Sequence, residues 1–174
     1  MDSAVKVRPR TSGDMAALVE LAAKVRETDG YPLFLPDGDL FRFLTQPAPL
    51  AAWVAEEGER IVGHVATNAR SHSSAMRVIR EAGITGEVGV IARLLVDPTR
   101  QRQGIGTKLL ERAATHVKSL GRTPVLDVVA SSTPAVSLYQ RCGWKELGSA
   151  IFPGPNQAIT ELVFAATCSP TSST

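Results

Sequence analysis

Two apolar runs separated by a helical segment constrain the fold of this chain more than any other feature. The first run, VGVIARLLV at residues 88–96, has almost no polar interruption, which is typical of a strand covered on both faces. The second, PVLDVVA, occupies residues 124–130. Between them, apolar residues recur at helical spacing at Ile105, Leu109, Ala113, Val117 and Leu120. A strand, a crossing helix and a second strand predict a parallel strand pair.

The remaining segments add antiparallel strands and further helices. Residues 50–57 and 60–69 are two strands around a Gly-containing turn, which predicts a hairpin. Thr11 and Asp14 have the capping-box spacing and open a helix. Further strands are expected at 4–8, 144–151 and 157–166, helices near 40–44 and 133–142, and an irregular connection at 70–86. The predicted fold class is α/β, a central mixed, mostly antiparallel sheet flanked by helices. One domain is expected over residues 1–166, with a disordered tail at 167–174.

The composition and charge of the chain argue against several classes of protein. The chain has 174 residues, 44% hydrophobic and 21% charged, with a net charge of +2, which argues against a nucleic-acid binder with a strongly basic surface. No apolar run reaches the length of a membrane span, and the first residues lack the pattern of a secretory signal. Two cysteines, Cys142 and Cys168, have neither a disulfide framework nor metal-ligand spacing. We therefore expect a cytoplasmic protein with no membrane and no nucleic-acid partner.

The segment VDPTRQRQGIGTKLL, residues 96–110, predicts an anion site. A helix that begins near Gly104 presents free N–H groups and the positive end of its dipole, and glycine lets a phosphate approach them. Arg100 and Arg102 add charge, and residues 97–122 have a local net charge of +4. The segment matches neither a P-loop nor the dinucleotide fingerprint, since Leu109 occupies the place of the third glycine.

This loop resembles the coenzyme A pyrophosphate loop of the GCN5-related N-acetyltransferases (GNAT), with signature [QR]-x-x-G-x-[GA]. Gln101, Gly104 and Gly106 match it. The downstream LDVVASSTPAVSLYQRCGW resembles the second motif of the family, and the likeness spans most of residues 4–165. The resemblance implies acetyl transfer from acetyl-CoA to a primary amine of a small molecule or peptide. Many members of the family are homodimers, and this chain could form one.

The resemblance also assigns site residues. The pyrophosphate would contact the N–H groups of Gln103, Gly104, Ile105, Gly106 and Thr107, with Gln101 and Arg102 beside them. Leu94 and Val96 would offer main-chain partners to the pantetheine arm, and Ser132 stands where the family often has Asn. Tyr139 would be the general acid toward the departing thiolate.

One position departs from the family. Many members have a glutamate where this chain has Val90, and the nearest carboxylate, Glu87, falls on the opposite strand face. A water relay anchored by Glu87, Asp127 or Glu161 could replace that base. The missing glutamate also leaves open a non-catalytic acyl-CoA-binding or sensor module on the same fold.

Other candidates have structural interpretations. Cys142, His64, Trp53 and Trp144 are expected in the core, and the three histidines do not have metal spacing, so no metal is expected. An aromatic, proline-framed loop could either cover an amine substrate or pack on itself; its aromatic residues are Tyr31, Phe34 and Phe41.

Overall fold

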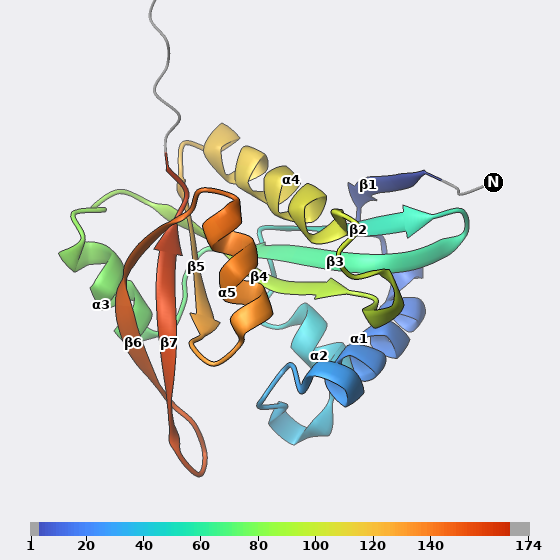
Figure 1. Ribbon diagram of the computed structural model, residues 1–174, viewed down its shortest axis with the longest axis horizontal. Helices are drawn as coiled ribbons and strands as arrows, with labels where there is room; N and C mark the ends of the chain where they lie inside the picture. Colours follow the sequence, from blue (N-terminus) through green and yellow to red (C-terminus); the bar gives the residue numbers. More distant parts are fainter. Residues whose placement is uncertain (1–3, 168–174) are drawn as a thin grey trace, which may run out of the picture.

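The computed structural model describes residues 4–167 and forms a seven-stranded sheet with helices on both faces (Figure 1). The strands are β1 Val5–Pro9, β2 Ala51–Glu57, β3 Arg60–Asn68, β4 Val88–Val96, β5 Thr123–Val129, β6 Lys145–Pro153 and β7 Ala158–Ala165. The helices are α1 Met15–Asp29, α2 Leu40–Thr45, α3 Ser73–Glu81, α4 Ile105–Ser119 and α5 Thr133–Arg141. Three 3-10 turns are η1 Ser12–Asp14, η2 Pro36–Gly38 and η3 Pro98–Arg100. Most of the predicted tail lies outside the described residues.

The strand order is β1-β2-β3-β4-β5-β7-β6. All neighbours pair antiparallel except β4 and β5, which are parallel and joined through α4. This arrangement confirms the predicted hairpin of β2 and β3, the parallel crossover and the mixed, mostly antiparallel sheet. The β6–β7 hairpin extends well past the other strands (Figure 1).

One prediction about the fold is wrong. Residues 70–86 are not merely an irregular connection, because they contain α3. His72 caps this helix by accepting the Ala75 N–H, and Ala75, Met76 and Ile79 are buried against β6 and β7. The helix is only nine residues long and is rich in serine and arginine, so its apolar face spans too few turns to stand out in the sequence.

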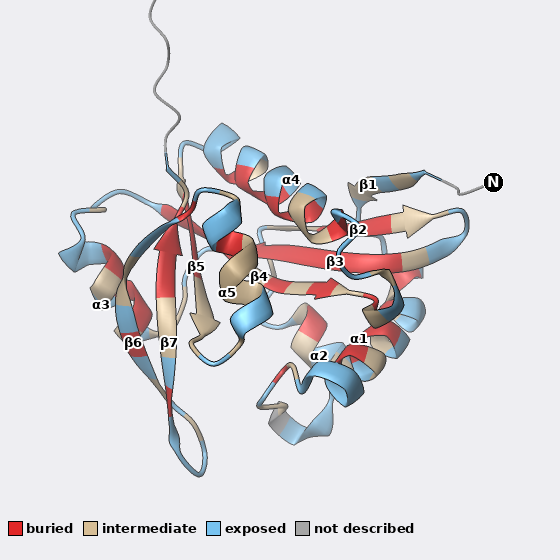
Figure 2. Ribbon diagram, viewed as in Figure 1, coloured by how far each residue is buried: buried red, intermediate tan, exposed pale blue. Residues whose placement is uncertain are grey.

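The core has two layers. On one face, α4 and α5 pack on the sheet; on the other, α1 and α2 cover β3 and β4 while α3 covers β6 and β7. Figure 2 shows this burial along the middle of the sheet and the inner side of α4. Two glycines let α4 approach closely, since a Cβ at Gly63 would meet Leu109 at 2.8 Å and one at Gly89 would meet Val117 at 2.5 Å.

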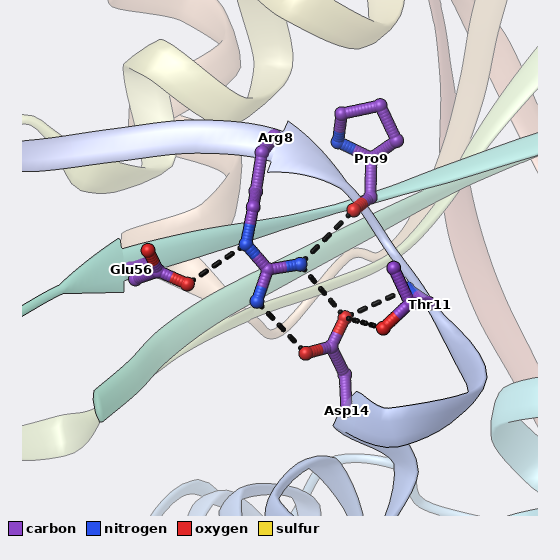
Figure 3. Close-up of polar contacts among 5 residues, drawn as sticks. All are labelled: Arg8, Pro9, Thr11, Asp14 and Glu56. Atoms are coloured by element: carbon purple, nitrogen blue, oxygen red, sulfur yellow. Dashed lines mark hydrogen bonds and ion pairs between the residues drawn. The ribbon is translucent and has the colours of Figure 1, made fainter. Parts of the chain in front are cut away.

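A closed network of charges joins the start of the chain to the sheet (Figure 3). The Arg8 guanidinium donates to Glu56 at 2.7 Å and to both carboxylate oxygens of Asp14 at 2.8 and 2.9 Å. Asp14 also accepts the Thr11 N–H at 2.7 Å, as the capping-box spacing predicts. Arg8 holds the pKa of Asp14 at about 2, and burial only partly opposes this shift.

Candidate active site

β4 and β5 diverge after a short paired stretch, and we call the space between them the opening. The two strands pair only where Val88–Val90 lie beside Thr123–Val125, although β4 continues to Val96 and β5 to Val129. Beyond Val90, the edge of β4 that faces β5 therefore has no strand partner among residues 4–167 for its N–H and C=O groups. This is where the family resemblance places the main-chain contacts of Leu94 and Val96, and both side chains pack toward the α4 face.

The glycine loop follows β4 directly and ends at α4. Gly104 is the N-cap of α4 with φ +80°, and no acidic residue lies in the first turn. A Cβ at Gly104 would have no heavy atom within 4 Å, so the space above the loop is open. The first backbone bond of the helix is Lys108 N–H to Gly104 C=O, which leaves the N–H groups of the first turn without helical partners. The loop thus fits an anion such as a pyrophosphate.

The two glycines of the loop have different tasks. Gly104 takes a left-handed backbone conformation, which favours glycine. At Gly106, a Cβ would lie 3.3 Å from Leu138 of α5 and 3.7 Å from Val96, so this glycine allows α4, α5 and β4 to meet. Ile105 is buried in the core, which leaves only its main chain for a ligand.

Ion pairs and hydrogen bonds brace the loop from several elements. Lys24 of α1 contacts Asp97 at 2.8 Å, and Asp97 also accepts the Thr99 N–H at 2.9 Å. The Gln101 side chain donates to Asp29 at 2.9 Å, so it holds the loop to α1. These bonds fix the loop at the end of β4.

Two of the loop arginines differ in how their charge is used. Arg100, expected to add charge for the anion, is paired with Glu57 at 2.9 Å, which compensates that charge. Arg102 is exposed at φ +64° and has no ion-pair partner among residues 4–167. Gln103 is exposed and Thr107 partly so. Arg102 therefore remains the arginine of this loop whose charge is uncompensated within the described chain.

A cluster of polar side chains lies on the opposite side of the opening. We call it the acid cluster: Ser71, His72, Asp127 and Glu161. The strand register places Asp127 of β5 and Glu161 of β7 on the same face, because Asp127 lies opposite Val163 and Glu161 opposite Val129. The loop before α3 adds the other two side chains, so three separate segments converge here.

Hydrogen bonds hold both carboxylates in place. Nδ1 of His72 accepts the Ala75 N–H at 3.4 Å, so Nε2 carries the proton and donates to Glu161 at 2.6 Å. The Ser71 hydroxyl donates to Asp127. No lysine or arginine among residues 4–167 forms an ion pair with either carboxylate. Burial and the neighbouring Asp127 charge raise the pKa of Glu161, and the His72 bond opposes this only in part.

The acid cluster also offers the ligand types of a metal site. One atom each of His72, Asp127 and Glu161 can be chosen so that all lie within 4.8 Å of one another. A divalent cation could use this set, and so could an ammonium group.

Tyr139 lies in the core on the other face of the sheet at the same opening. Its ring packs against Trp144 and Phe164, and its hydroxyl has no hydrogen-bond partner among residues 4–167. Burial raises the pKa of Tyr139 far above that of free tyrosine, and the nearby Tyr31, Asp127 and Cys142 add to the rise. Tyr139 therefore stays protonated and can donate a proton.

The aromatic loop borders the acid cluster only in part. Phe34 packs on Phe152 of β6, and His72 lies edge-on to the same Phe152 ring at 5.2 Å. Tyr31 packs edge-on against Phe43, and its burial raises its pKa to about 12. Phe41 is 52% exposed. Thus Tyr31 and Phe34 lie at the site side of the loop, whereas Phe41 does not.

Several other candidates have clear places. Glu87 precedes β4, is largely exposed and pairs with Arg122 at 3.4 Å, so it lies apart from the acid cluster and we do not retain it as a base. Ser132 is the N-cap of α5 and its side chain makes no capping bond. Cys142 packs at the edge of the core, as expected, and Trp53 and Trp144 are buried. No helix among the described residues is long and apolar enough to cross a membrane.

A comparison with known families fits this geometry. Residues 17–144 match the model of the Acetyltransferase (GNAT) family. The chain belongs to the GNAT acetyltransferase family. Acetyl transfer is thus its general chemistry. No curated protein matches the chain by sequence.

Solved structures share the GNAT fold at low sequence identity. The ribosomal-protein-S18-alanine N-acetyltransferase from Escherichia coli is 17% identical, with a TM-score of 0.64 over 98% of this chain and 100% of that chain. Arabidopsis thaliana NAA60 in complex with a bisubstrate analogue is 20% identical, with a TM-score of 0.69 over 94% and 97%. The putative acetyltransferase yncA from Salmonella typhimurium, with its cofactor acetyl-CoA, is 16% identical, with a TM-score of 0.66 over 98% and 97%. These likenesses establish the fold.

The sequence predicts a glycine loop between a buried strand and a helix, which the structure has, but it does not predict the composition of the acid cluster. Asp127 and Glu161 are candidate anchors of a water relay from the sequence, whereas Ser71 and His72 fall in the segment expected to be an irregular connection. The signal that could have joined them is the serine- and histidine-rich SHSS, which precedes a short amphipathic helix and so predicts an N-cap.

Proposed function

We propose that the protein is an N-acetyltransferase that moves an acetyl group from acetyl-CoA to a primary amine by direct attack. The observation that carries the proposal is the acid cluster at the opening between β4 and β5, where no lysine or arginine of residues 4–167 pairs with either carboxylate. Two partly buried carboxylates that the described part of the chain leaves without a lysine or arginine favour a cationic ligand there. An acceptor amine, which arrives as an ammonium ion, is such a ligand.

The coenzyme would lie along β4 and the glycine loop. The first-turn N–H groups of α4 and the charge of Arg102 suit its pyrophosphate. The unpaired edge of β4 suits its pantetheine arm, through the main chain of Leu94 and Val96. This placement brings the thioester to the opening, between Tyr139 on one side and the acid cluster on the other.

The chemistry then needs three proton transfers. Glu161, with its raised pKa and its bond to His72, accepts a proton from the ammonium, directly or through a water, while Asp127 holds the amine. The amine nitrogen attacks the acetyl carbonyl carbon, the C–N bond forms and the C–S bond breaks. Tyr139 gives its hydroxyl proton to the departing thiolate. The nitrogen, which has two protons and a positive charge after the attack, gives one of them through water to the Tyr139 phenolate, and Glu161 releases its proton to solvent. The products are an acetamide, coenzyme A with a free thiol and one proton.

Replacing Tyr139 by Phe tests the chemical step. The ring and its packing remain and only the proton donor is lost, so kcat should fall about 10²–10⁴-fold while the affinity for acetyl-CoA changes little. Release of free thiol from acetyl-CoA across a panel of amines measures both enzymes. Wild-type protein that binds acetyl-CoA and releases no thiol with any amine would support the non-catalytic binding module instead.

Replacing Gly104 by Val tests the coenzyme site. A side chain there would occupy the open space in front of the first-turn N–H groups, and each charge-assisted bond lost costs about 1.5–3 kcal/mol, or roughly 10- to 150-fold in Kd. Gly121→Val is a matched control, because Gly121 follows the other end of α4 with φ +72° and equally open surroundings. Calorimetry should show weak binding only for the Gly104 variant, at similar melting temperatures. Equal affinities would contradict the pyrophosphate assignment.

A further inference from the structure

β4 contains an extra residue at the point where the acyl group would lie. Ala92 pairs with Ala66 of β3, and Leu95 pairs with His64, so three steps along β4 match two along β3. The irregularity falls at Arg93, which has φ +55°, a conformation that non-glycine residues rarely adopt. Because of the extra residue, Leu94 faces the α4 side while Leu95 packs in the cluster beside α1.

The His64 side chain holds this bulge through the main-chain carbonyl of Arg93. The side chain is fully buried, and Nδ1 lies 2.9 Å from the Arg93 carbonyl oxygen. Arg10 donates to Nε2 at 3.1 Å, so Nε2 is the acceptor and Nδ1 carries the proton that is donated to Arg93. Burial lowers the pKa of His64 to about 4, which keeps this donor and acceptor arrangement at neutral pH.

The same bulge is tied to the end of α2. Arg93 donates through Nη2 to the Gln46 carbonyl, and its guanidinium lies 5.7 Å from the centre of the Phe43 ring. Arg10 donates to the Leu44 carbonyl at 2.9 Å. Side-chain bonds thus fasten the bulge from β3, from the segment after β1 and from α2.

The direction of one N–H group follows from this. Arg93 C=O and Leu94 N–H belong to one planar trans peptide, so they point in opposite directions. With the carbonyl held by His64 on the β3 side, the Leu94 N–H points away from β3, toward the opening beside β5. Any tilt of the carbonyl tilts the N–H by the same angle.

We propose that His64 is a positioning residue, which fixes the Arg93–Leu94 peptide so that the Leu94 N–H meets the acetyl carbonyl oxygen during transfer. The inference rests on the proposed function. It assigns to a histidine outside the coenzyme loop a role that its fully buried strand position does not suggest. A merely structural histidine would affect folding and not the rate of transfer in folded protein.

The test compares two variants with the wild type. His64→Phe keeps a ring and removes the donor, whereas His64→Asn replaces Nδ1–H by an amide N–H at a similar distance from the backbone. We expect kcat about 10- to 100-fold lower for His64→Phe, since a donor to the developing oxyanion is misaligned. The Kd for acetyl-CoA should stay within about threefold, because the pyrophosphate contacts of the α4 loop and the main-chain contacts of Val96 are untouched, and only the Leu94 contact is tilted. His64→Asn should recover most of kcat. Thr67→Val, equally buried on β3 but facing β2, is the control for folding.

A second readout does not need turnover. In full-length protein, the ¹³C shift of the Arg93 carbonyl and the amide shift of Leu94 should change in His64→Phe and return toward wild type in His64→Asn. A folded His64→Phe with unchanged kcat, or with unchanged Arg93 and Leu94 shifts, overturns the proposal. Wild-type protein that transfers no acetyl group contradicts the proposed function, and the shifts then still decide whether His64 sets this peptide.

Discussion

Two partly buried groups of carboxylates in this protein have opposite electrostatics. In the Arg8 network, one guanidinium lies between Glu56 and Asp14, and the pKa of Asp14 falls to about 2. In the acid cluster, Asp127 and Glu161 have no lysine or arginine partner among residues 4–167, and the pKa of Glu161 is raised. In the first group, both carboxylates are paired with a positive charge in the folded chain. The second lacks a positive charge and can take up a proton, which is what an amine-binding, base-supplying site needs.

The largest expected difference between the two groups of carboxylates is the effect of a Glu→Gln substitution on kcat. Glu161→Gln keeps the shape of the side chain and its contact with His72 but removes the proton acceptor, so kcat should fall about 10²–10⁴-fold. Glu56→Gln makes the same change in the Arg8 network and should leave kcat within about twofold, because Glu56 lies away from the opening. Steady-state thiol release measures both. Equal effects of the two variants would remove the functional distinction between the two groups.

For the free energy of unfolding, we expect a substitution in the Arg8 network to matter more than one in the acid cluster. The pKa of Asp14 is lowered in the folded state, so its contribution is present above the unfolded value near pH 4 and is lost as the pH falls toward 2. Asp14→Asn should therefore cost about 2 kcal/mol of unfolding free energy at pH 7 and almost nothing near pH 2. Asp127→Asn should cost less at pH 7, or stabilise the fold, since it removes an uncompensated charge. Urea unfolding at both pH values distinguishes the two cases.

The smallest expected effect concerns metals. If an ammonium group is the natural partner of the acid cluster, prolonged treatment with EDTA should change kcat by less than about 1.5-fold, within the scatter expected of a site that needs no ion. The His72–Asp127–Glu161 set could still bind added Zn²⁺, which would then inhibit in competition with the amine. Activity that is lost with EDTA and restored by a metal would make the cluster a metal centre and would contradict the expectation from the sequence.

The sequence predicted one side of the candidate site much better than the other. The strand, glycine loop and helix proposed to hold the coenzyme were predictable because their signals are local: an apolar strand, Gly104 and Gly106, and a helix follow one another within 32 residues, at 88–119. The acid cluster was not. Ser71, Asp127 and Glu161 are up to 90 residues apart in the chain and meet only through strand register and the placement of α3. The partner of Arg100 was hidden for the same reason, because Glu57 belongs to another strand.

The role of His64 was beyond the sequence for another physical reason. Its place between Val62 and Val65 in a strand correctly predicts burial. A bulge leaves no pattern in an apolar run such as VGVIARLLV, so neither the left-handed Arg93 nor the direction of its carbonyl could be foreseen.

Because β4 and β5 pair over only a short stretch, the sheet consists of two groups of strands joined by a narrow junction. Four strands lie on one side and three on the other, with three residue pairs between them and α4 bridging above. A coenzyme laid along the free edge of β4 acts in mechanical terms as a partial eighth strand, and its binding adds to the free energy of unfolding. At a concentration 100 times Kd, the gain is about 2.7 kcal/mol. Acetyl-CoA bound along β4 would thus stabilise the junction between the two groups of strands as well as serve as a substrate.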